Sequence, residues 1–399
     1  MRFARPRLLV TVALAGLGLS LWLAVTGEAR AAAAKPIRVT SKLPDWVAPG
    51  GRIVVHGVAY PDERVALRAD GRTLARTRSG PLGAYVLRGR LAGSGRQLLK
   101  VAAGGVARRI GRVLVRPLRI TAVGDVTYGE GVGVMMRQYG PRYPWLDVAP
   151  VLRRADITVI NLETAVSNRG RAWPGKEFTF RGPPKALRAT AKFAGVDVVS
   201  LANNHSLDYG RVAFADTLRF IRKFGLVKMG GGRNLDRARR PGVIEVGGLS
   251  VAFLGFSDVR PPGFDAGPGR SGATPALPQL IEADVRKAAR HHDLVVVYFH
   301  WGIERDATPT ARQRSLGRLT LRSGADVVLG AHPHVLQPRE RKGARGRKLV
   351  AWSLGNFVFT GTSARTRTTG ILNVKLGRTG VLDTGWRRTH IVNSQPQLG

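Results

Sequence analysis

From residue 118 onward, short runs of valine, isoleucine and leucine alternate with segments whose apolar residues recur every three or four positions. The runs have the length and composition of buried β-strands, and the segments between them have the periodicity of amphipathic helices. This alternation predicts an α/β domain whose helices cover a largely buried sheet. We expect strands at residues 119–123, 157–160, 196–201, 251–256, 294–299 and 327–329, helices at 147–154, 184–194, 212–224, 280–291 and 311–321, and closing strands around 349–353, 370–374 and 386–392.

The pattern before residue 117 is different and contains short strands only. Turn residues such as Asp70-Gly71 separate these strands, which we place at residues 52–57, 64–69, 84–87, 97–102 and 111–115. Strands at this spacing predict a small all-β sandwich of immunoglobulin-like type. We therefore divide the chain into a β-sandwich at residues 35–116 and an α/β domain at residues 117–399.

Residues 1–34 have the pattern of a targeting segment. Arg2, Arg5 and Arg7 precede an uncharged apolar run at residues 8–25, and small residues follow that run. These features predict a secretory signal peptide. The run is also just long enough to remain as an uncleaved membrane anchor. Both alternatives predict that the rest of the chain is extracytoplasmic, either secreted or anchored to a membrane.

The net charge of the chain indicates which kinds of molecule it could bind. The chain has 64 Lys+Arg against 26 Asp+Glu, which gives a net charge of +38, and it has no cysteine. Such a charge favours anionic polymers, although an arginine-rich composition on a solvated surface explains it equally well. Because the basic residues are spread along an exported chain, we expect no nucleic-acid partner. The absence of cysteine excludes disulfides, thiolate metal sites and cysteine nucleophiles.

Several predicted strands of the α/β domain end in polar residues that can bind a metal ion. Since open α/β sheets place ligands at the carboxyl ends of their strands, these residues are candidates for one site. Oxygen and nitrogen ligands without sulfur suit divalent ions such as Mn, Zn or Fe. Six ligands are too many for one tetrahedral zinc and fit a two-metal site with one bridging carboxylate. Two such ions can hold a hydroxide between them and clamp a phosphoryl oxygen for attack. The candidate ligands are Asp125, Glu163, Asn204, His300, His332 and His334.

A candidate proton donor lies beside these ligands. His205 directly follows Asn204 and is not needed as a ligand, so it is the natural general acid for a leaving oxygen. Asp208 either orients that imidazole or caps the helix that follows, and the sequence favours the cap.

Taken in order, these strand ends and their flanking residues resemble the CapA-type poly-gamma-glutamate capsule biosynthesis proteins, which belong to the calcineurin-like metallophosphatase superfamily. The resemblance covers about residues 119–359 and implies a four-layer α/β/β/α sandwich with a dinuclear metal centre. The motifs that carry it are Gly124-Asp125-Val126, Asn161-Leu162-Glu163, Ala202-Asn203-Asn204-His205, His300-Trp301-Gly302, Ala331-His332-Pro333-His334 and Ser353-Leu354-Gly355-Asn356-Phe357.

The resemblance also implies roles for individual residues. Asp125 and His334 would bind the first metal, and Glu163 would stand at the place of the bridging carboxylate. The second metal would take Asn204, His300 and His332. His205 would be the general acid, and Asp208 is grouped with it as a catalytic candidate. Arg181 and Glu304 stand at positions suited to binding an anionic substrate or to supporting the metal ligands.

The resemblance predicts an exported protein of capsule or surface-polymer synthesis with a phosphoesterase-type site, in which hydroxide attacks a phosphoryl group. Its expected partners are an anionic cell-surface polymer or a phosphorylated precursor, the capsule synthesis machinery, and a membrane through the N-terminal segment. One departure supports an alternative: Thr127 stands where the superfamily usually has a histidine. In that alternative the chain is a catalytically silent scaffold that binds an anionic polymer or its synthase.

Overall fold

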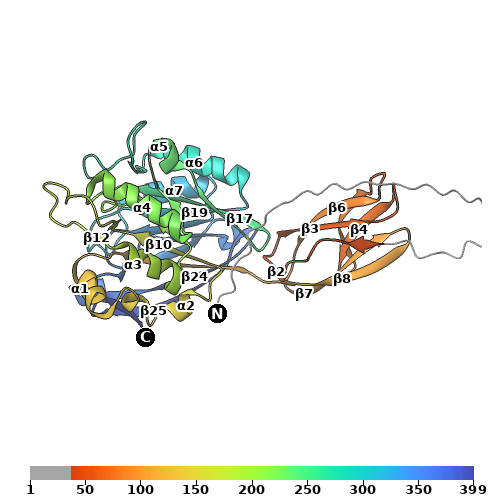
Figure 1. Cartoon of the computed structure of the whole chain (residues 1–399), viewed down its shortest axis with the longest axis horizontal. Helices are drawn as coiled ribbons and strands as arrows, with labels where there is room; N and C mark the ends of the chain where they lie inside the picture. Colours follow the sequence, from red (N-terminus) through yellow and green to blue (C-terminus); the bar gives the residue numbers. More distant parts are fainter. Residues whose placement is uncertain (1–36) are drawn as a thin grey trace, which may run out of the picture.

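A computed structural model describes residues 37–399, which form an elongated molecule (Figure 1). A small all-β part lies at one end, and a larger part with helices and sheets forms the other. The α/β class predicted from residue 118 onward is confirmed. The predicted signal peptide or anchor at residues 1–34 lies outside the described residues. Within residues 37–399, none of the helices combines the length and the apolar character needed to cross a membrane.

The N-terminal part consists of two small sheets around a shared apolar core. One sheet has the order β1 (Arg38–Val39), β3 (Gly51–Val58) and β6 (Ala84–Leu91), and the other has the order β2 (Trp46–Val47), β8 (Val106–Val115), β7 (Gly95–Ala103), β4 (Arg64–Ala69) and β5 (Arg72–Arg78). Alternate residues of β3 and β4 are buried, because one face of each strand meets the core and the other meets water. The immunoglobulin-like type and the domain boundaries stay predictions.

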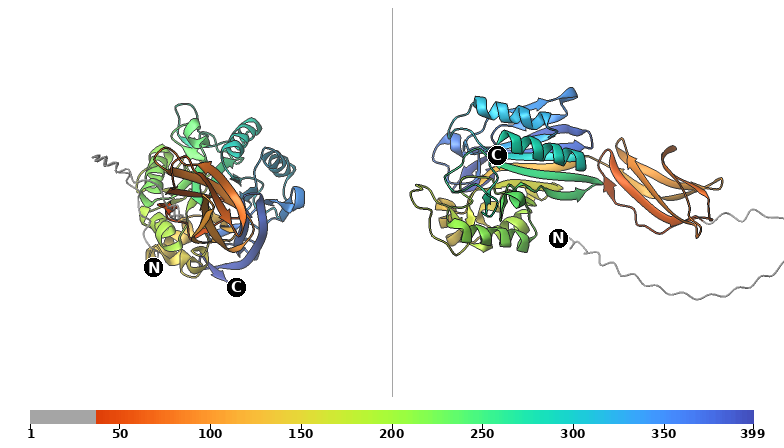
Figure 2. Two further views of the ribbon diagram at one scale, coloured as in Figure 1. Left: turned by 90° about the vertical axis from the view of Figure 1, so that its right-hand side faces the viewer. Right: turned by 90° about the horizontal axis from the view of Figure 1, so that it is seen from above.

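The N-terminal part contacts the α/β part directly. The Ala48 N–H donates to the carbonyl of Gly247 at 2.8 Å. Arg90 forms an ion pair with Asp293 at 3.0 Å. Trp46 packs against the core of the α/β part. These contacts hold the small sandwich against the larger part (Figure 2).

The first sheet of the α/β part is mixed. Strands β9, β10, β13 and β14 run parallel, and β24, β25 and β26 continue the sheet in antiparallel fashion. Its order is β14 (Val227–Met229), β13 (Val198–Ser200), β10 (Ile157–Leu162), β9 (Leu118–Val126), β24 (Thr368–Gly377), β25 (Gly380–Val392) and β26 (Gln395–Leu398), and β23 (Asn356–Val358) also pairs with β9.

The second sheet has four parallel strands, β17, β19, β20 and β22, and an antiparallel strand at each edge. Its order is β16 (Gly242–Val246), β17 (Leu249–Ser257), β19 (Leu294–His300), β20 (Val327–Ala331), β22 (Lys348–Ala351) and β21 (Arg339–Lys342). Every residue of β19 is buried, as expected for a central strand that is covered on both faces.

Helices cover the outer face of each sheet (Figure 2). The first sheet carries α1 (Glu130–Tyr139), α2 (Ala149–Leu152), α3 (Pro184–Ala189), its π-helical continuation η2 (Thr190–Ala194) and α4 (Gly210–Phe224), and the second carries α6 (Pro278–His291) and α7 (Ala311–Arg322). Shorter elements connect them: β11 (Ala165–Val166), β12 (Arg181–Gly182), β15 (Gly231–Gly232), β18 (Gly272–Ala273), α5 (Leu235–Arg239), α8 (Ala364–Arg367), η1 (Tyr143–Trp145) and η3 (Ala344–Gly346).

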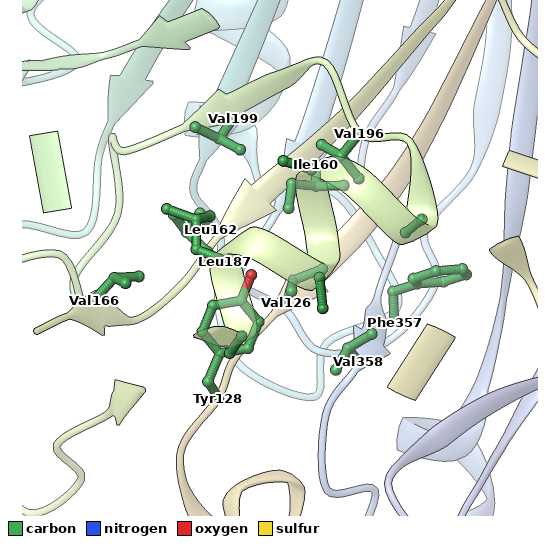
Figure 3. Close-up of a cluster of buried hydrophobic side chains, with 14 of the residues drawn as sticks. Val126, Tyr128, Ile160, Leu162, Val166, Leu187, Val196, Val199, Phe357 and Val358 are labelled. Carbon is green, nitrogen blue, oxygen red and sulfur yellow. The ribbon is translucent and has the colours of Figure 1, made fainter. Parts of the chain in front are cut away.

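Three apolar cores separate these layers. The central core lies between the two sheets and includes Val159 from the first and Val296 from the second. The outer core of the first sheet joins strand residues such as Ile160 and Leu162 to Leu187 of α3 (Figure 3). The outer core of the second sheet joins its strands to α6 and α7. The central parallel strands of both sheets are therefore covered on both faces, and their carboxyl ends meet along one edge.

The structure differs from the predicted elements in several places, and the prediction lacks the sheet strands β14, β16, β21, β23 and β26. Helix α1 was not predicted, because Gly129, Gly131 and Gly133 interrupt its pattern. The helix predicted at residues 147–154 is shorter, and the one predicted at 184–194 changes from α- to π-helical geometry at Thr190. Strand β5 was missed because none of its residues is fully buried, so it lacks the apolar run that marks a core strand.

Candidate metal centre

The predicted ligands come together because parallel strands of both sheets end at the same edge. Asp125 lies at the end of β9, and Glu163 follows β10. From the second sheet, His300 ends β19 and His332 follows β20. The side chains of Asp125, Glu163 and His300 are fully buried. The site therefore forms only when the two sheets pack against each other, since each sheet supplies part of the ligands.

One group of candidate ligands consists of Asp125, Glu163 and His334, whose ligand atoms all lie within 4.8 Å of one another. His334 Nδ1 lies 3.3 Å from Asp125 Oδ2. Burial opposes ionisation of Asp125, but the hydrogen bond and charge of His334 hold the pKa of this carboxyl well below its usual range. Burial lowers the pKa of His334, but the hydrogen bond and charge of Asp125 outweigh burial, so the pKa of His334 lies above its usual value.

A second group consists of Glu163, His300 and His332, again with ligand atoms within 4.8 Å. His300 Nε2 lies 3.5 Å from Glu163 Oε1, and the rings of the two histidines are 4.7 Å apart. Burial and the neighbouring imidazole lower the pKa of His300 well below normal, and burial and His334 lower the pKa of His332 to about 3. Both imidazoles are therefore neutral at pH 7, which is the form that binds a metal.

Glu304, His332 and His334 form a third group that meets the same distance limit. Glu304 was predicted to bind substrate or to support the ligands, and the structure places its exposed carboxylate beside two candidate ligands. Since His332 and His334 each belong to two groups, the groups form one connected cluster rather than separate sites.

Two buried atoms of this cluster test whether it fits a cation. Glu163 Oε1 and His332 Nδ1 are buried, and within the described part of the chain neither has a hydrogen-bond partner. Burial and the charge of Asp125 raise the pKa of Glu163 well above normal. A buried carboxylate oxygen without a donor is costly, and a bound cation would remove that cost. The residues therefore fit a divalent metal ion held by oxygen and nitrogen ligands.

The loop that carries His332 and His334 has an unusual backbone. Both residues have positive φ angles, 96° and 58°, with Pro333 between them. Positive φ is unfavourable for residues other than glycine and persists where the surrounding structure enforces it. Here it turns the imidazoles of His332 and His334 toward the same cluster. Both histidines were among the predicted ligands.

Asn204 lies at the rim of the cluster, where its Oδ1 is 2.8 Å from His300 Nε2. This places the predicted amide ligand against a predicted imidazole ligand. Arg181, by contrast, has no contact with the cluster in the described residues. Its guanidinium lies over the ring of Tyr209 at 4.1 Å, and it donates to the carbonyls of Arg169 and Gly170.

His205 also faces the cluster. Its Nδ1 lies 2.6 Å from Asp208 Oδ2, its ring stacks on Phe180 at 4.1 Å, and its Nε2 lies 3.8 Å from Glu163 Oε1. Burial lowers the pKa of His205, and Asp208 partly offsets that effect. Nε2 is therefore the ring nitrogen that is presented to a molecule bound at the cluster.

The favoured interpretation of Asp208 as a helix cap was wrong. Helix α4 has Tyr209 as its N-cap, and no side chain bonds to the first turn. Asp208 instead accepts hydrogen bonds from His205, from the Phe180 N–H at 2.6 Å and from Lys176. The carboxylate points away from the helix because stronger donors lie on the other side, and so it orients the imidazole.

Sequence reasoning missed Lys176. Its Nζ contacts Asp208 Oδ1, lies 2.9 Å from His205 Nδ1 and donates to the carbonyl of Asn204 at 2.6 Å. Burial lowers the pKa of Lys176, and the charge of Asp208 opposes that effect. Lys176 lies in a loop without periodicity, so the sequence offers no signal that it reaches residues almost thirty positions later.

Two further asparagines support the ligands. Asn161, which pairs with Asp125 across the sheet, donates to Asp125 Oδ1 at 2.7 Å and lies 3.2 Å from His300 Nδ1. Asn203 donates to Asn161 Oδ1 at 3.0 Å and accepts from the His205 N–H. Both stand in motifs that the sequence singled out, so their position at strand ends was the available signal.

Thr127 occupies the place where a histidine was expected. It is buried, and its Oγ1 accepts a hydrogen bond from the Gly129 N–H at 3.2 Å. Its hydroxyl thus supports the turn that leads into α1. The Asp125 group consequently has a single imidazole within the stated distance limit, that of His334.

Fold and site together define a mixed α/β protein with a buried cluster of carboxylate and imidazole ligands. Residues 119–361 match the family described as "Bacterial capsule synthesis protein PGA_cap", and the chain belongs to this family. The predicted membership of the CapA-type proteins is thereby confirmed.

Individual relatives agree with this assignment. The chain is 34% identical to the "PGA biosynthesis protein CapA" of Bacillus subtilis (strain 168) over 265 residues, which are 66% of this chain and 69% of that protein. It is 32% identical to the "Capsule biosynthesis protein CapA" of Bacillus anthracis over 275 residues, covering 67% of this chain and 66% of that protein. Among solved structures, the Haemophilus influenzae NAD nucleotidase (NadN) superposes with a TM-score of 0.40 at 11% identity, covering 71% of this chain and 59% of that chain, a likeness too distant to bear on activity.

Proposed function

We propose that this protein is an exported, metal-dependent phosphoesterase that acts in the synthesis or attachment of an anionic capsular polymer. Support for the capsule role comes from its family and from relatives named for capsule and PGA biosynthesis. The observation that supports the chemistry is the buried ligand cluster around Glu163 Oε1, which has no donor among the described residues. The sandwich of two sheets between helix layers is consistent with the calcineurin-like superfamily that the motifs resemble.

The ligands divide the work between two positions. Asp125, His334 and the carboxylate of Glu163 would hold one divalent ion, and Glu163, His300, His332 and Asn204 would hold the other. When bound, divalent ions would supply Lewis-acid activation of water and of a phosphoryl oxygen. Mn, Zn and Fe all suit this donor set.

His205 and its neighbours would supply the proton. Asp208 accepts from Nδ1, so Nε2 faces the cluster and can give its proton to a leaving oxygen. Phe180 stacks on the ring and keeps water from that face. Asp208 stabilises the imidazolium that must form before each proton transfer, and Lys176 opposes it, so the two together set how readily His205 is protonated.

Thr127 favours a second candidate function, a scaffold without catalysis. Residue 127 is a threonine whose hydroxyl supports a turn, so the first metal position would lack the histidine usual in the superfamily that the motifs resemble. In this candidate the fold and the basic surface bind an anionic polymer or its synthase, and the cluster is vestigial. The enzyme would hydrolyse phosphoesters with the ligand cluster, whereas the scaffold would bind its partner without the cluster and would hydrolyse nothing.

The test combines metal analysis with hydrolysis of an aryl phosphodiester and an aryl monoester in the presence of Mn²⁺. We expect His205→Ala to retain metal but lose about 10²–10⁴-fold in rate, the usual contribution of a general acid. Asp125→Asn should lose both metal and activity. His56→Ala, an exposed histidine in the N-terminal part, is the matched control and should change neither. A wild-type protein without bound metal and without activity would refute the enzyme and leave the scaffold.

A further inference from the structure

The end of the N-terminal part that lies farthest from the α/β part exposes apolar side chains, and we call this end the tip. Strand β3 begins beside the α/β part, where the Arg52 N–H donates to the Gly248 carbonyl at 2.8 Å, and it ends at the tip roughly 23 Å away. Strand β6 begins at the tip, and β7 and β8 are joined by a turn there (Figure 2). The exposed large apolar side chains of residues 37–115 all lie at this end: Val58, Tyr60, Leu82 and Val106.

Leu82 is the most exposed of them, with 91% of its surface open to water. It stands in a closed turn, in which the Gly83 N–H donates to the Gly80 carbonyl at 2.8 Å. Pro81 and Gly83 occupy the positions of a type I turn that favour proline and glycine, and Gly83 has a φ of 79°. The backbone therefore holds Leu82 outward, and a partner that covered it would have little backbone freedom to remove.

The neighbouring turn extends the apolar surface. The Ala59 N–H donates to the Gly83 carbonyl at 2.9 Å, so the turn that carries Tyr60 is bonded to the turn that carries Leu82. A Cβ at Gly83 would lie 3.2 Å from a methyl group of Val58, which places that side chain against the same two turns. Single exposed apolar residues are ordinary on proteins, but a group of them on adjoining turns marks a surface that another molecule covers.

The described chain also begins at the tip. Arg38 of β1 pairs with Val58 of β3, and the Arg108 side chain donates to the Ile37 carbonyl at 2.6 Å. The apolar run at residues 8–25 is expected to be a signal peptide or a membrane anchor, and residues 26–36 join it to Ile37. Eleven residues span at most about 40 Å when fully extended. If the run is an anchor, it holds the tip within that distance of the bilayer.

Charge does not select the partner of the tip, because both signs are present there. Asp62 and Glu63 follow Tyr60 in the same turn, and Arg64 begins β4 directly after them. The apolar side chains are therefore the feature that distinguishes this end. A tyrosine beside a projecting leucine suits the boundary between lipid headgroups and acyl chains, where a ring with a polar edge is favoured.

We propose that the tip docks on the lipid bilayer, with Leu82 and Tyr60 entering the headgroup region. The membrane is the occupant because the segment expected to anchor the chain joins the molecule at this same end. The proposal rests on the proposed export of the protein, and it does not depend on the chemistry of the ligand cluster.

Docking at the tip orients the whole molecule. Strand β9 leaves the N-terminal part at Leu118 and runs to Asp125, so the ligand cluster lies at the other end of the elongated molecule (Figure 1). The small sandwich then stands between the bilayer and the cluster. A substrate would therefore be met away from the lipid surface, on a chain that extends outward from it.

Fluorescence quenching in vesicles tests this orientation with the full-length protein. The chain has no cysteine, so the variant Leu82→Cys carries one thiol for a polarity-sensitive fluorophore. The protein is reconstituted into phosphatidylcholine vesicles that contain a lipid with a nitroxide on its acyl chain. We expect strong quenching and a blue shift at residue 82. The matched control is Ile303→Cys, a 60% exposed apolar position beside the cluster, which should show neither effect.

A second pair of variants tests whether Leu82 itself makes the contact. With the fluorophore at Tyr60→Cys, the added change Leu82→Ser should lower the ratio of docked to undocked tips about tenfold, the effect expected from losing one buried leucine. Val212→Ser, which changes a 51% exposed side chain on α4, should leave that ratio unchanged. Both changes are at exposed positions, and circular dichroism would verify that the variants fold.

Four results would overturn the proposal. Protein that does not float with the vesicles, or equal quenching at residues 82 and 303, would show that the tip has no particular contact with lipid. A blue shift at residue 82 that grows with protein concentration in the absence of vesicles would show that the tip binds a second copy. Docking that requires added phosphatidylglycerol would assign the contact to cations. Loss of phosphoester hydrolysis with quenching intact would refute only the proposed enzyme.

Discussion

Replacing Asp208 with asparagine should destabilise the protein strongly, because this carboxylate is the partner of a mostly buried cation. The Asp208 side chain is fully buried, and that of Lys176 is 15% exposed. The carboxylate also accepts from the Phe180 N–H and contacts His205 Nδ1. Asparagine would present an amide N–H to one of these donors and leave the ammonium group without a counter-charge. Removing one partner of a buried ion pair costs about 3–5 kcal/mol.

A double-mutant cycle separates this pair from general damage. Lys176→Met removes the cation and keeps the volume of the side chain, so the double variant lacks both charges. We expect the double variant to be more stable than the sum of the single effects by about 1–3 kcal/mol, since the two residues are in contact. Urea unfolding in the presence of a chelator, followed by circular dichroism, measures this without any contribution from bound metal.

The matched control is Asp383→Asn, which removes the partner of Lys375 from an ion pair whose side chains are 58% and 49% exposed. An exposed pair contributes about 0.2–1 kcal/mol, so this variant should change little. If Asp208→Asn costs no more than Asp383→Asn, or if the cycle gives no coupling energy, the buried pair does not hold the loop against His205. The reasoning about His205 orientation would then fail as well.

Three shorter predictions concern other parts of the molecule. Burial raises the pKa of Asp326 from 3.8 to about 6, so the folded state binds this proton more tightly than the unfolded state does. The free energy of unfolding should therefore fall by up to about 3 kcal/mol as the pH rises from about 4 to 6. Urea unfolding measured across this pH range should show that Asp326→Asn abolishes this component. A Cβ at Gly124 would lie 1.7 Å from a backbone carbonyl, so Gly124→Ala should cost at least about 3 kcal/mol in thermal unfolding, whereas Gly269→Ala, with open space, should be neutral. Asn161→Leu removes the donor to Asp125 and should weaken Mn²⁺ affinity by about 10–100-fold in a chelator competition, and unchanged affinity would contradict its supporting role.

The sequence predicted the central strands of the α/β part well because they are buried on both faces. A strand such as β19 is a continuous apolar run, and its length and flanking residues identify it without knowledge of its neighbours. Helix α1 escaped prediction because its glycines serve close packing: a Cβ at Gly131 would lie 2.7 Å from Thr360 Oγ1. The need for glycine at this position comes from a contact with a residue distant in the sequence, so the local periodicity of apolar residues does not reveal it.

The candidate site also contains residues that the sequence could predict and residues that it could not. Asp125, His300 and His332 could be predicted because each ends a recognisable strand and parallel strand ends meet at one edge. Lys176 could not, because its position depends on a loop that folds back across the sheet edge. The role of Asp208 was misjudged for a related reason: its neighbours in sequence suggested a cap, and its neighbours in space decided otherwise.

The ligand cluster depends on the contact between the two sheets, and the central core controls that contact. The Tyr298 hydroxyl donates to the Val123 carbonyl at 2.8 Å and so joins the second sheet to the first. Tyr298 lies two residues before His300 on β19, and Val123 lies two residues before Asp125 on β9. Both groups are buried, and neither could lose this bond without exposing an unpaired polar atom to the core. The distance between the carboxylates on one sheet and the imidazoles on the other is therefore fixed by packing, and side chains that never touch a metal ion determine whether one can bind.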